Sequence, residues 1–348
     1  MPMASPQNKG TILVTGGGGY VGGQIVREAL ESGFNVRLTA RSASSADRSV
    51  ARFPAYAAQL STAVIPDMTV PESYESSFAD GAITGIIHAA SPFVLDPQDN
   101  VRDLLDPAIK GATAVLDAAL RYGGGKVTRV VATSSFAAVK DLSQGKRVGY
   151  TYSEKDWNPV SFKEAAVANG VVAYCASKAL AERAMWDWMA THKSEITFTL
   201  ATICPPWVFG PYASALRATK SGLSESVQLL NNMIDADAVP AFDFGGYADS
   251  REVAAAHVRA LEVPEAAGKR FLVGQDFRYQ AAADIARETV PELKTRLPVG
   301  NPGEWEDAYH VDGSLATRVL GLKYGTLRDT VTDTYVQLLK AREIEAAA

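Results

Sequence analysis

Apolar residues recur along the first half of the chain in an order typical of alternating strands and helices. An apolar run at residues 11–15 is followed by four glycines and then by apolar positions at helical spacing over 20–32. Gly33 ends this helix, and a second apolar run covers 34–40. A strand, a helix and a strand within about thirty residues have the length of one βαβ unit.

The same alternation continues as far as residue 203. Further apolar runs and helical patterns lie at 63–66, 83–90, about 101–121, 126–133, 171–192 and 198–203. Strands that are apolar on both faces are expected where helices cover both sides of a parallel sheet. The pattern therefore predicts an α/β fold built on a doubly wound parallel Rossmann sheet.

The periodicity weakens after Cys204, where prolines and glycines punctuate a loop-rich segment. We expect this segment to close over a ligand rather than extend the sheet. A late strand is predicted at 270–273, and helices near 281–288 and 327–345. The prediction is a nucleotide-binding core at 8–203, with later returns to the sheet near 249–275, and a smaller, interleaved C-terminal substrate lobe that occupies mainly 204–348.

Composition narrows the class of protein. The chain has 348 residues, of which 47% are hydrophobic and 21% charged, with a net charge of -5 at pH 7, as in an ordinary globular protein. An acidic balance disfavours nucleic acid as a partner. Residues 1–10 carry no apolar leader and no stretch is long enough to span a bilayer, so we expect a cytoplasmic protein with no membrane partner.

Cysteines and histidines argue against a disulfide or a metal site. Cys175 and Cys204 are expected to be free thiols, because a chain of this size needs no disulfide to hold its core. The histidines are scattered and lack the paired spacing of metal ligands, so we predict no metal. They are His88, His192, His257 and His310.

The glycine run is the first motif with a chemical meaning. It reads T-G-G-G-G-Y-V-G between the first strand and the first helix. Gly16 permits a tight turn, Gly19 lets the backbone approach a pyrophosphate, and Gly22 lets the helix lie close to the strand. In this setting the run predicts dinucleotide binding rather than a merely flexible loop.

The end of the second strand indicates which dinucleotide binds. Arg41 is followed by Ser42, Ser44 and Ser45, while the first acid, Asp47, comes too late to accept from a ribose 2′-hydroxyl. A cationic, hydroxyl-rich turn suits a 2′-phosphate. NADP(H) is therefore the predicted cofactor, the alternative being that Arg41 is only a solvated surface charge.

Tyr174 and Lys178 are four residues apart on a predicted helix and so share one face. A fixed ammonium beside a phenol is expected to lower the phenol pKa and make it a proton donor to a carbonyl oxygen. Ser134 and Ser135 end a predicted strand and could hydrogen-bond the same oxygen, although they could equally bond turn N–H groups. The chain has no G-x-S-x-G elbow, which disfavours a serine hydrolase.

Together these motifs resemble a known family. The glycine motif, Ala89-Ala-Ser-Pro92, Thr133-Ser-Ser135, Y-C-A-S-K and the segment 205–211 look like extended short-chain dehydrogenases/reductases. The dihydroflavonol-reductase-like and fungal aldehyde-ketone (carbonyl) reductases are the most similar branch. The resemblance runs from about Thr11 to the segment 249–254. One departure is Cys204, where the family frequently has Asn.

The resemblance implies residue roles. Tyr174 would be the general acid, Lys178 its pKa modulator and a ribose ligand, and Ser135 the donor to the carbonyl oxygen, with Ser134 left open. The implied cofactor contacts are Gly16, Gly19, Tyr20, Val21, Arg41 at the 2′-phosphate, Asp67 and Met68 at the adenine, Ala89, Ala90, Ser91, Thr133, Pro205 and Val208. Phe93, Phe136 and Trp207 would line the substrate pocket, or they are ordinary core aromatics.

The predicted function is NADPH-dependent reduction of ketones or aldehydes to alcohols, on substrates with an apolar or aromatic body. Alternatives are a nucleotide-sugar epimerase or a hydroxysteroid-type dehydrogenase of the same family, and a noncatalytic NADP(H)-sensing regulator. The expected partner is a small carbonyl or alcohol molecule. The sequence leaves open the physiological substrate, stereoselectivity, reaction direction, and whether the protein is a monomer or a homodimer.

Overall fold

The central sheet confirms the predicted α/β class. The computed structural model describes residues 8–91, 97–216, 219 and 222–347. Its main sheet is parallel, in the order β10-β7-β5-β4-β1-β2-β3. The strands are β1 (Thr11–Thr15), β2 (Asn35–Ala40), β3 (Leu60–Val64), β4 (Ile83–His88), β5 (Arg129–Thr133), β7 (Thr199–Cys204) and β10 (Lys269–Leu272).

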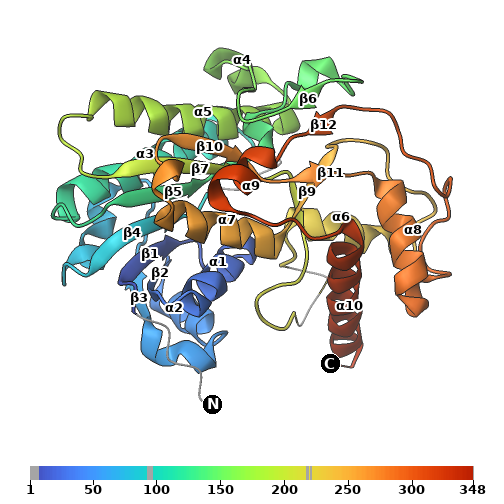
Figure 1. Cartoon of the computed structure of the whole chain (residues 1–348), viewed down its shortest axis with the longest axis horizontal. Coiled ribbons are helices and arrows are strands. Elements are labelled where there is room, and N and C mark those ends of the chain that lie inside the picture. Colours follow the sequence, from blue (N-terminus) through green and yellow to red (C-terminus); the bar gives the residue numbers. More distant parts are fainter. Residues whose placement is uncertain (1–7, 92–96, 217–218, 220–221, 348) are drawn as a thin grey trace.

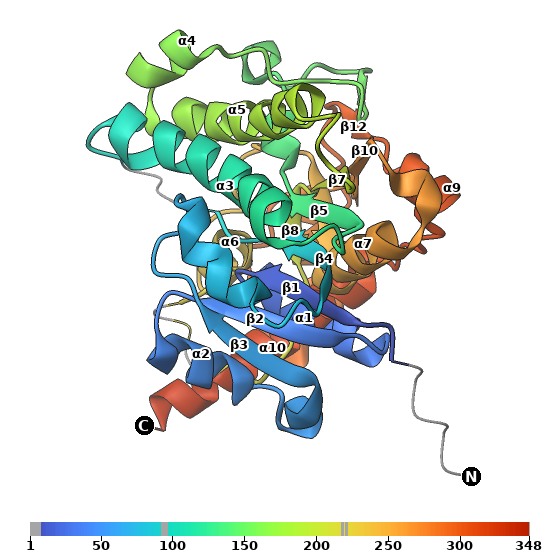
Figure 2. The same ribbon diagram turned by 90° about the vertical axis from the view of Figure 1, so that its left-hand side faces the viewer.

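Helices cover both faces of this sheet (Figure 1). On one face α1 (Tyr20–Glu31) packs against α7 (Ser250–Glu262), and on the other α3 (Asp106–Tyr122) packs against α5 (Gly170–Thr191). Figure 2 shows the two layers above and below the strands, with α2 (Ala43–Val50) beside β2 and β3. The strand order reverses where β1 meets β4, and ligands of such sheets bind outside the carboxyl ends at that point.

Two predicted strands are displaced in the structure. The third strand spans Leu60–Val64 rather than 63–66, since Leu60 already pairs with Val36, and Pro66 has no N–H to donate to the ladder. The fifth begins at Arg129 rather than 126, because a glycine turn with positive φ at Gly124 and Gly125 delays the extended backbone.

The second half of the chain contains more regular structure than its sequence indicated. A three-stranded sheet is formed by β8 (Trp207–Phe209), β9 (Gly246–Asp249) and β11 (Gln275–Asp276), and β6 (Thr151–Tyr152) pairs with β12 (His310–Val311). These strands are too short for an alternating pattern to reveal them. The remaining α-helices are α4 (Phe162–Val167), which precedes α5, and α6 (Glu225–Met233), α8 (Tyr279–Thr289), α9 (Ser314–Leu320) and α10 (Leu327–Ala346) in the second half. The domain boundary near residue 204 stays a prediction.

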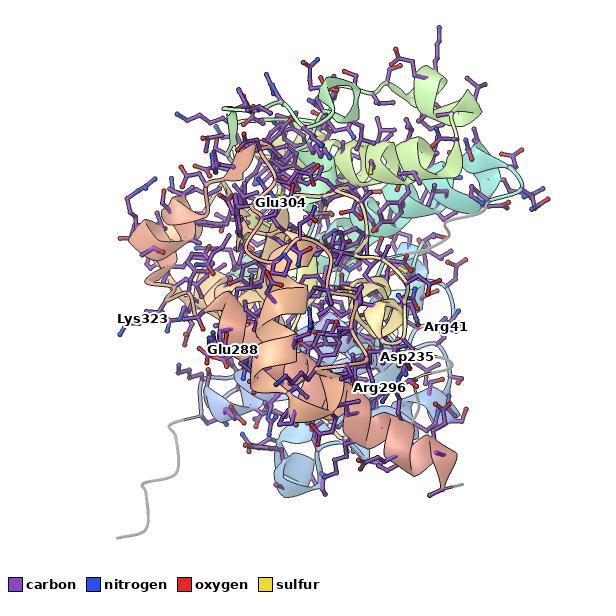
Figure 3. The ribbon with its side chains drawn as sticks, turned by 90° about the vertical axis from the view of Figure 1, so that its right-hand side faces the viewer. Arg41, Asp235, Glu288, Arg296, Glu304 and Lys323 are labelled. Carbon is purple, nitrogen blue, oxygen red and sulfur yellow. The ribbon has the colours of Figure 1, made fainter. Side chains whose placement is uncertain are left out.

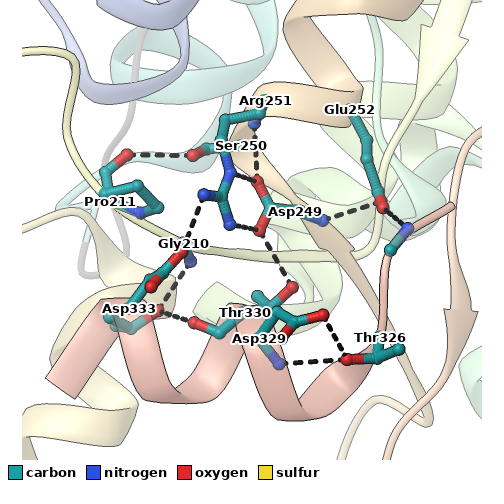
Figure 4. Close-up of polar contacts among 12 residues, drawn as sticks. Gly210, Pro211, Asp249, Ser250, Arg251, Glu252, Thr326, Asp329, Thr330 and Asp333 are labelled. Atoms are coloured by element: carbon teal, nitrogen blue, oxygen red, sulfur yellow. Dashed lines mark hydrogen bonds and ion pairs between the residues drawn. The ribbon is translucent and has the colours of Figure 1, made fainter.

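Asp249 ties the core to this second half of the chain (Figure 4). It caps α7, and its carboxylate accepts from the Arg251 side chain and, at 2.9 Å, from the Thr330 hydroxyl of α10. The next residue, Ser250, donates to the Pro211 carbonyl at 2.9 Å. The network therefore holds the loop after β8 between α7 and α10.

An ion pair fixes the C-terminal end of α6. Asp235 follows this helix and pairs with Arg296 at 2.6 Å, and Figure 3 shows the two side chains together beside α10. Arg342 of α10 also donates to the side chain of Asn231 in α6 at 3.0 Å. The Asp235–Arg296 pair is largely exposed, so we expect it to orient the helix more than it stabilises the fold.

Candidate active site

The glycine loop has the close contacts that a dinucleotide site requires. Gly16 has φ +71°, and a Cβ there would lie 2.7 Å from the Ala90 nitrogen. A Cβ on Gly22 would lie 2.1 Å from the Gly16 carbonyl oxygen, so α1 can approach β1 only because residue 22 is glycine. The α1 N–H groups then face the crevice beyond β1 and β4, where they favour a bound anion. The loop therefore fits a pyrophosphate.

Arg41 is the residue predicted to contact the 2′-phosphate of NADP(H). It is exposed at the end of β2, and among the described residues it makes no hydrogen bond or ion pair. The next residue, Ser42, caps α2 by accepting from the Ser45 nitrogen at 3.3 Å. A helix N-terminus beside an unpaired guanidinium suits a phosphate group.

Two predicted cofactor residues have hydroxyl groups that are already engaged. The Tyr20 hydroxyl donates to the Gly210 carbonyl at 2.7 Å. Thr133 Oγ1 lies 2.7 Å from Nε2 of His257, whose Nδ1 is 2.7 Å from the Val253 carbonyl. Burial lowers the pKa of His257 to about 4, so the neutral ring donates from Nδ1 and accepts from Thr133. Other atoms of Tyr20 and Thr133 would have to contact a cofactor.

A cavity of about 530 Å³ brings together residues from the two halves of the chain. Among the predicted site residues, its lining includes Tyr20, Val21, Ala89, Ser91, Thr133, Ser135, Phe136, Tyr174, Lys178, Pro205, Trp207 and Val208. Met68 and Ala90 line a smaller neighbouring cavity of about 30 Å³. Asp67 is exposed and its carboxylate accepts from Thr69, and Phe93 lies outside the described residues.

Tyr174 and Lys178 lie together on the face of α5 that borders the cavity. The Lys178 ammonium is 5.1 Å from the centroid of the Tyr174 ring and donates to the Ser91 hydroxyl at 2.7 Å. Ser91 follows the carboxyl end of β4. The lysine thus connects the phenol with the crevice in which the glycine loop lies.

The expected lowering of the Tyr174 pKa is wrong for this structure. Burial raises the pKa of the phenol, and electrostatic interactions with Cys175 and Glu225 raise it further. Burial also lowers the pKa of Lys178 to about 8, because a low-dielectric site disfavours the ammonium as it disfavours the phenolate. Tyr174 consequently remains protonated at neutral pH, which is the form a proton donor needs.

The two adjacent serines have different partners. Ser134 Oγ donates to Glu182 Oε2 at 2.6 Å. Ser135 Oγ accepts from the Ala137 nitrogen at 3.1 Å, and its own hydrogen has no acceptor among the described residues. Of these two serines, Ser135 therefore retains its hydroxyl hydrogen for a ligand in the cavity.

Glu182 is the centre of a buried polar cluster that the sequence did not reveal. Its carboxylate pairs with Arg270 at 2.7 Å and accepts from the Thr202 hydroxyl at 2.6 Å. Burial by itself would raise the pKa of Glu182, but the guanidinium and the hydroxyl donors outweigh it and the pKa is lowered. The spacing of four residues from Lys178 was the available signal, because it puts Glu182 on the same face of α5.

Two of the aromatic residues predicted for the substrate pocket both pack in the core and line the cavity. Phe136 is fully buried against Tyr152 and Tyr309, yet it also lines the cavity. Trp207 donates from Nε1 to the Asp243 carboxylate at 3.2 Å. Sequence reasoning missed Phe244, whose ring centroid is 5.3 Å from that of Trp207. These rings give the cavity an apolar wall.

The described residues offer neither a metal site nor a membrane-spanning helix. Within them, no cluster of three or more His, Cys, Asp or Glu side chains could hold a metal ion. Cys175 and Cys204 are buried free thiols, and burial raises the pKa of each to about 12. None of the helices in these parts of the chain combines the length and apolar character of a membrane span.

A parallel sheet of this order, a glycine loop and a Tyr/Lys pair define a dinucleotide-dependent enzyme of the extended short-chain dehydrogenase/reductase class. The chain belongs to the NAD dependent epimerase/dehydratase family, whose model matches residues 12–274. It is 34% identical to the NADPH-dependent methylglyoxal reductase GRE2 of Saccharomyces cerevisiae, over 95% of this chain and 98% of that one. It is also 34% identical to the ketoreductase azaE of Aspergillus niger, over 94% and 97%.

A solved structure agrees with these relatives. The yeast methylglyoxal/isovaleraldehyde reductase Gre2, crystallised with NADPH, superposes with a TM-score of 0.90 at 32% identity, over 96% of this chain and 99% of that one. A UDP-glucose 4-epimerase from Thermotoga maritima, at 17% identity and a TM-score of 0.68, shares the fold alone. The findings confirm the resemblance to the fungal carbonyl reductase branch.

Proposed function

We propose that this protein is an NADPH-dependent reductase that converts ketones or aldehydes to alcohols. The observation that carries the proposal is that Ser135, Tyr174 and Lys178 line one and the same cavity, at the carboxyl edge of a sheet whose glycine loop fits a dinucleotide. Relatives named as reductases of carbonyl compounds support it. Arg41, which has no partner in the part of the chain that the structure describes, supports NADP(H) over NAD(H).

Each side chain has a separate task in this reaction. Bound NADPH supplies the hydride. Tyr174 donates its phenolic proton to the carbonyl oxygen, and Ser135 donates a hydrogen bond to the same oxygen as negative charge develops there. Lys178 stabilises the phenolate that remains until a proton returns. The fixed positions of these groups around one carbonyl lower the activation barrier, as their acidity does.

The cavity wall supports substrates with an apolar or aromatic body. Phe136, Trp207, Phe244 and Leu229 line it, and rings bury large area with few polar demands. The other implied cofactor contacts remain part of the proposal. They are Gly19, Val21, Asp67, Met68, Ala89, Ala90, Ser91, Pro205 and Val208.

Two of the alternative functions, the epimerase and the noncatalytic sensor, have less support. The epimerase comparison rests on fold alone, whereas the relatives at 34% identity are named as reductases. A noncatalytic sensor of NADP(H) would need none of Ser135, Tyr174 and Lys178 around one cavity. Tightly held NAD in the purified protein would favour the epimerase, because a reductase must exchange its cofactor at each turnover.

The direct test follows NADPH oxidation with aromatic ketones and aldehydes. Tyr174→Phe should reduce kcat by roughly 10²–10⁴-fold while the protein still binds NADPH. Tyr122→Phe is the matched control, since this tyrosine is partly buried against the core and outside the cavity. Equal turnover by wild type and Tyr174→Phe would refute the assignment of the acid. The cytoplasmic location and the choice between monomer and homodimer stay predictions.

A further inference from the structure

Two carboxylates line the cavity that holds Tyr174. They are Glu225, the first residue of α6, and Asp243, in the segment before β9. Lys178 is the one lysine or arginine among the described lining residues, and it is engaged with Ser91. The charges that face a substrate are therefore predominantly negative, although the walls are apolar.

Asp243 is compensated within the protein. Its carboxylate accepts from Trp207 Nε1 at 3.2 Å and from the Tyr279 hydroxyl at 2.9 Å. The buried ammonium of Lys140 donates to the main-chain carbonyl of Asp243 at 2.7 Å and lies 4.5 Å from the centroid of the Phe244 ring. Asp243 thus has both a structural task and a nearby countercharge.

Glu225 has neither. Among the described residues no side chain or backbone group forms a hydrogen bond or an ion pair with its carboxylate, which is partly exposed in the cavity. The start of α6 does not depend on it, because the Ser224 hydroxyl caps the helix by accepting from the Val227 nitrogen at 3.4 Å. Glu225 also contributes to the raised pKa of Tyr174, so its charge reaches the phenol.

We propose that Glu225 determines substrate charge: it makes the enzyme discriminate against carbonyl compounds that carry a carboxylate and prefer neutral ketones and aldehydes. This rests on the proposed function. Two like charges about 10 Å apart, at the effective dielectric of a protein surface, repel by an energy equivalent to roughly tenfold in affinity. A carboxylate substrate feels that repulsion in the bound state, whereas its ester does not.

The test compares acetoacetate with its ethyl ester, which carry the same ketone and differ in charge. Initial rates with saturating NADPH are measured for wild type, Glu225→Gln, Glu225→Asp and Glu225→Lys. Glu75→Gln is the matched control, because Glu75 is exposed outside the cavity and makes no ion pair among the described residues. Circular dichroism and thermal unfolding establish that each variant is folded.

Wild type should prefer the ester. Glu225→Gln should raise kcat/KM for acetoacetate roughly tenfold, mainly through KM, while that for the ester changes by less than about twofold. Glu225→Lys should raise kcat/KM for acetoacetate further. Glu225→Asp and Glu75→Gln should keep the wild-type ratio of kcat/KM for the ester to kcat/KM for the acid. Added salt should narrow the wild-type preference, since the carboxylate is reached by solvent.

The outcomes separate the two proposals. No reduction of either compound, or of any other ketone, would contradict the proposed function itself. Reduction of the ester with an unchanged ester-to-acid ratio in folded Glu225→Gln would overturn the inference and leave the reductase proposal intact. A change in stability alone would mean that Glu225 serves only the helix dipole of α6, and would likewise overturn it.

Discussion

Ser134 donates its hydroxyl hydrogen to the carboxylate of Glu182 at 2.6 Å. The contact links the end of β5 to α5, the helix that carries Tyr174 and Lys178. It also removes Ser134 as a donor to a ligand and leaves Ser135 for that task.

The serines should be separable by substitution. Ser135→Ala removes a donor to the substrate oxygen and should lower kcat roughly 10²–10³-fold with little effect on unfolding. Ser134→Ala leaves Glu182 short of one donor and should cost about 1–3 kcal/mol of stability with a smaller loss of rate. Steady-state kinetics and urea unfolding of both variants measure this, and the reversed pattern would assign the role to Ser134.

Removing one partner of the buried Glu182–Arg270 ion pair should destabilise the fold. Both side chains are nearly inaccessible, at 1% and 9% exposure, so Arg270→Met leaves a buried carboxylate without its countercharge. We expect a loss of about 3–5 kcal/mol in urea unfolding. The double variant Glu182→Leu/Arg270→Met should be less destabilised than Arg270→Met alone. A double variant at least as unstable as that single one would contradict a dominant role for the uncompensated charge.

Reductase activity should fall at alkaline pH. Burial lowers the pKa of Lys178 to about 8, so its ammonium is present below that pH and lost above it. If the charged form is required, kcat/KM at saturating NADPH should fall about tenfold per pH unit above about pH 8. Arginine keeps its charge at these pH values, so kcat/KM of Lys178→Arg should not fall above about pH 8, even if its activity is lower throughout. A wild-type profile that is flat to pH 10 would exclude the ammonium as the required form.

Acid should destabilise the protein through two buried histidines. Burial lowers the pKa of His88 and of His257 to about 4, from an ordinary value of 6.5. Between these values the unfolded chain binds the protons and the folded one does not, so stability is lost as pH falls through that window. Each histidine contributes about 1.4 kcal/mol per pH unit. The slope of the free energy of unfolding against pH, measured by urea unfolding between pH 4 and 6.5, should be smaller by about that amount in His257→Gln. An unchanged slope would contradict a lowered pKa of His257.

Local sequence patterns were enough for the fold class and for two parts of the site. Strands β1, β4, β5 and β7 are buried on both faces, and Gly22 is required by its close approach to Gly16, six residues away. Tyr174 and Lys178 share a helix face by spacing alone. These features depend on backbone period and on neighbours in the chain, which a sequence displays directly.

Only the tertiary structure decided the rest, because it depends on burial and on contacts between distant segments. Arg270 is 88 residues from Glu182, and no spacing rule pairs them or tells Ser134 from Ser135. The sign of the Tyr174 pKa shift was predicted wrongly from the helix spacing, because desolvation by the folded chain exceeds the influence of one nearby ammonium. Glu225, whose carboxylate has no partner within the described parts of the chain, is likewise significant only because the start of α6 lines the cavity.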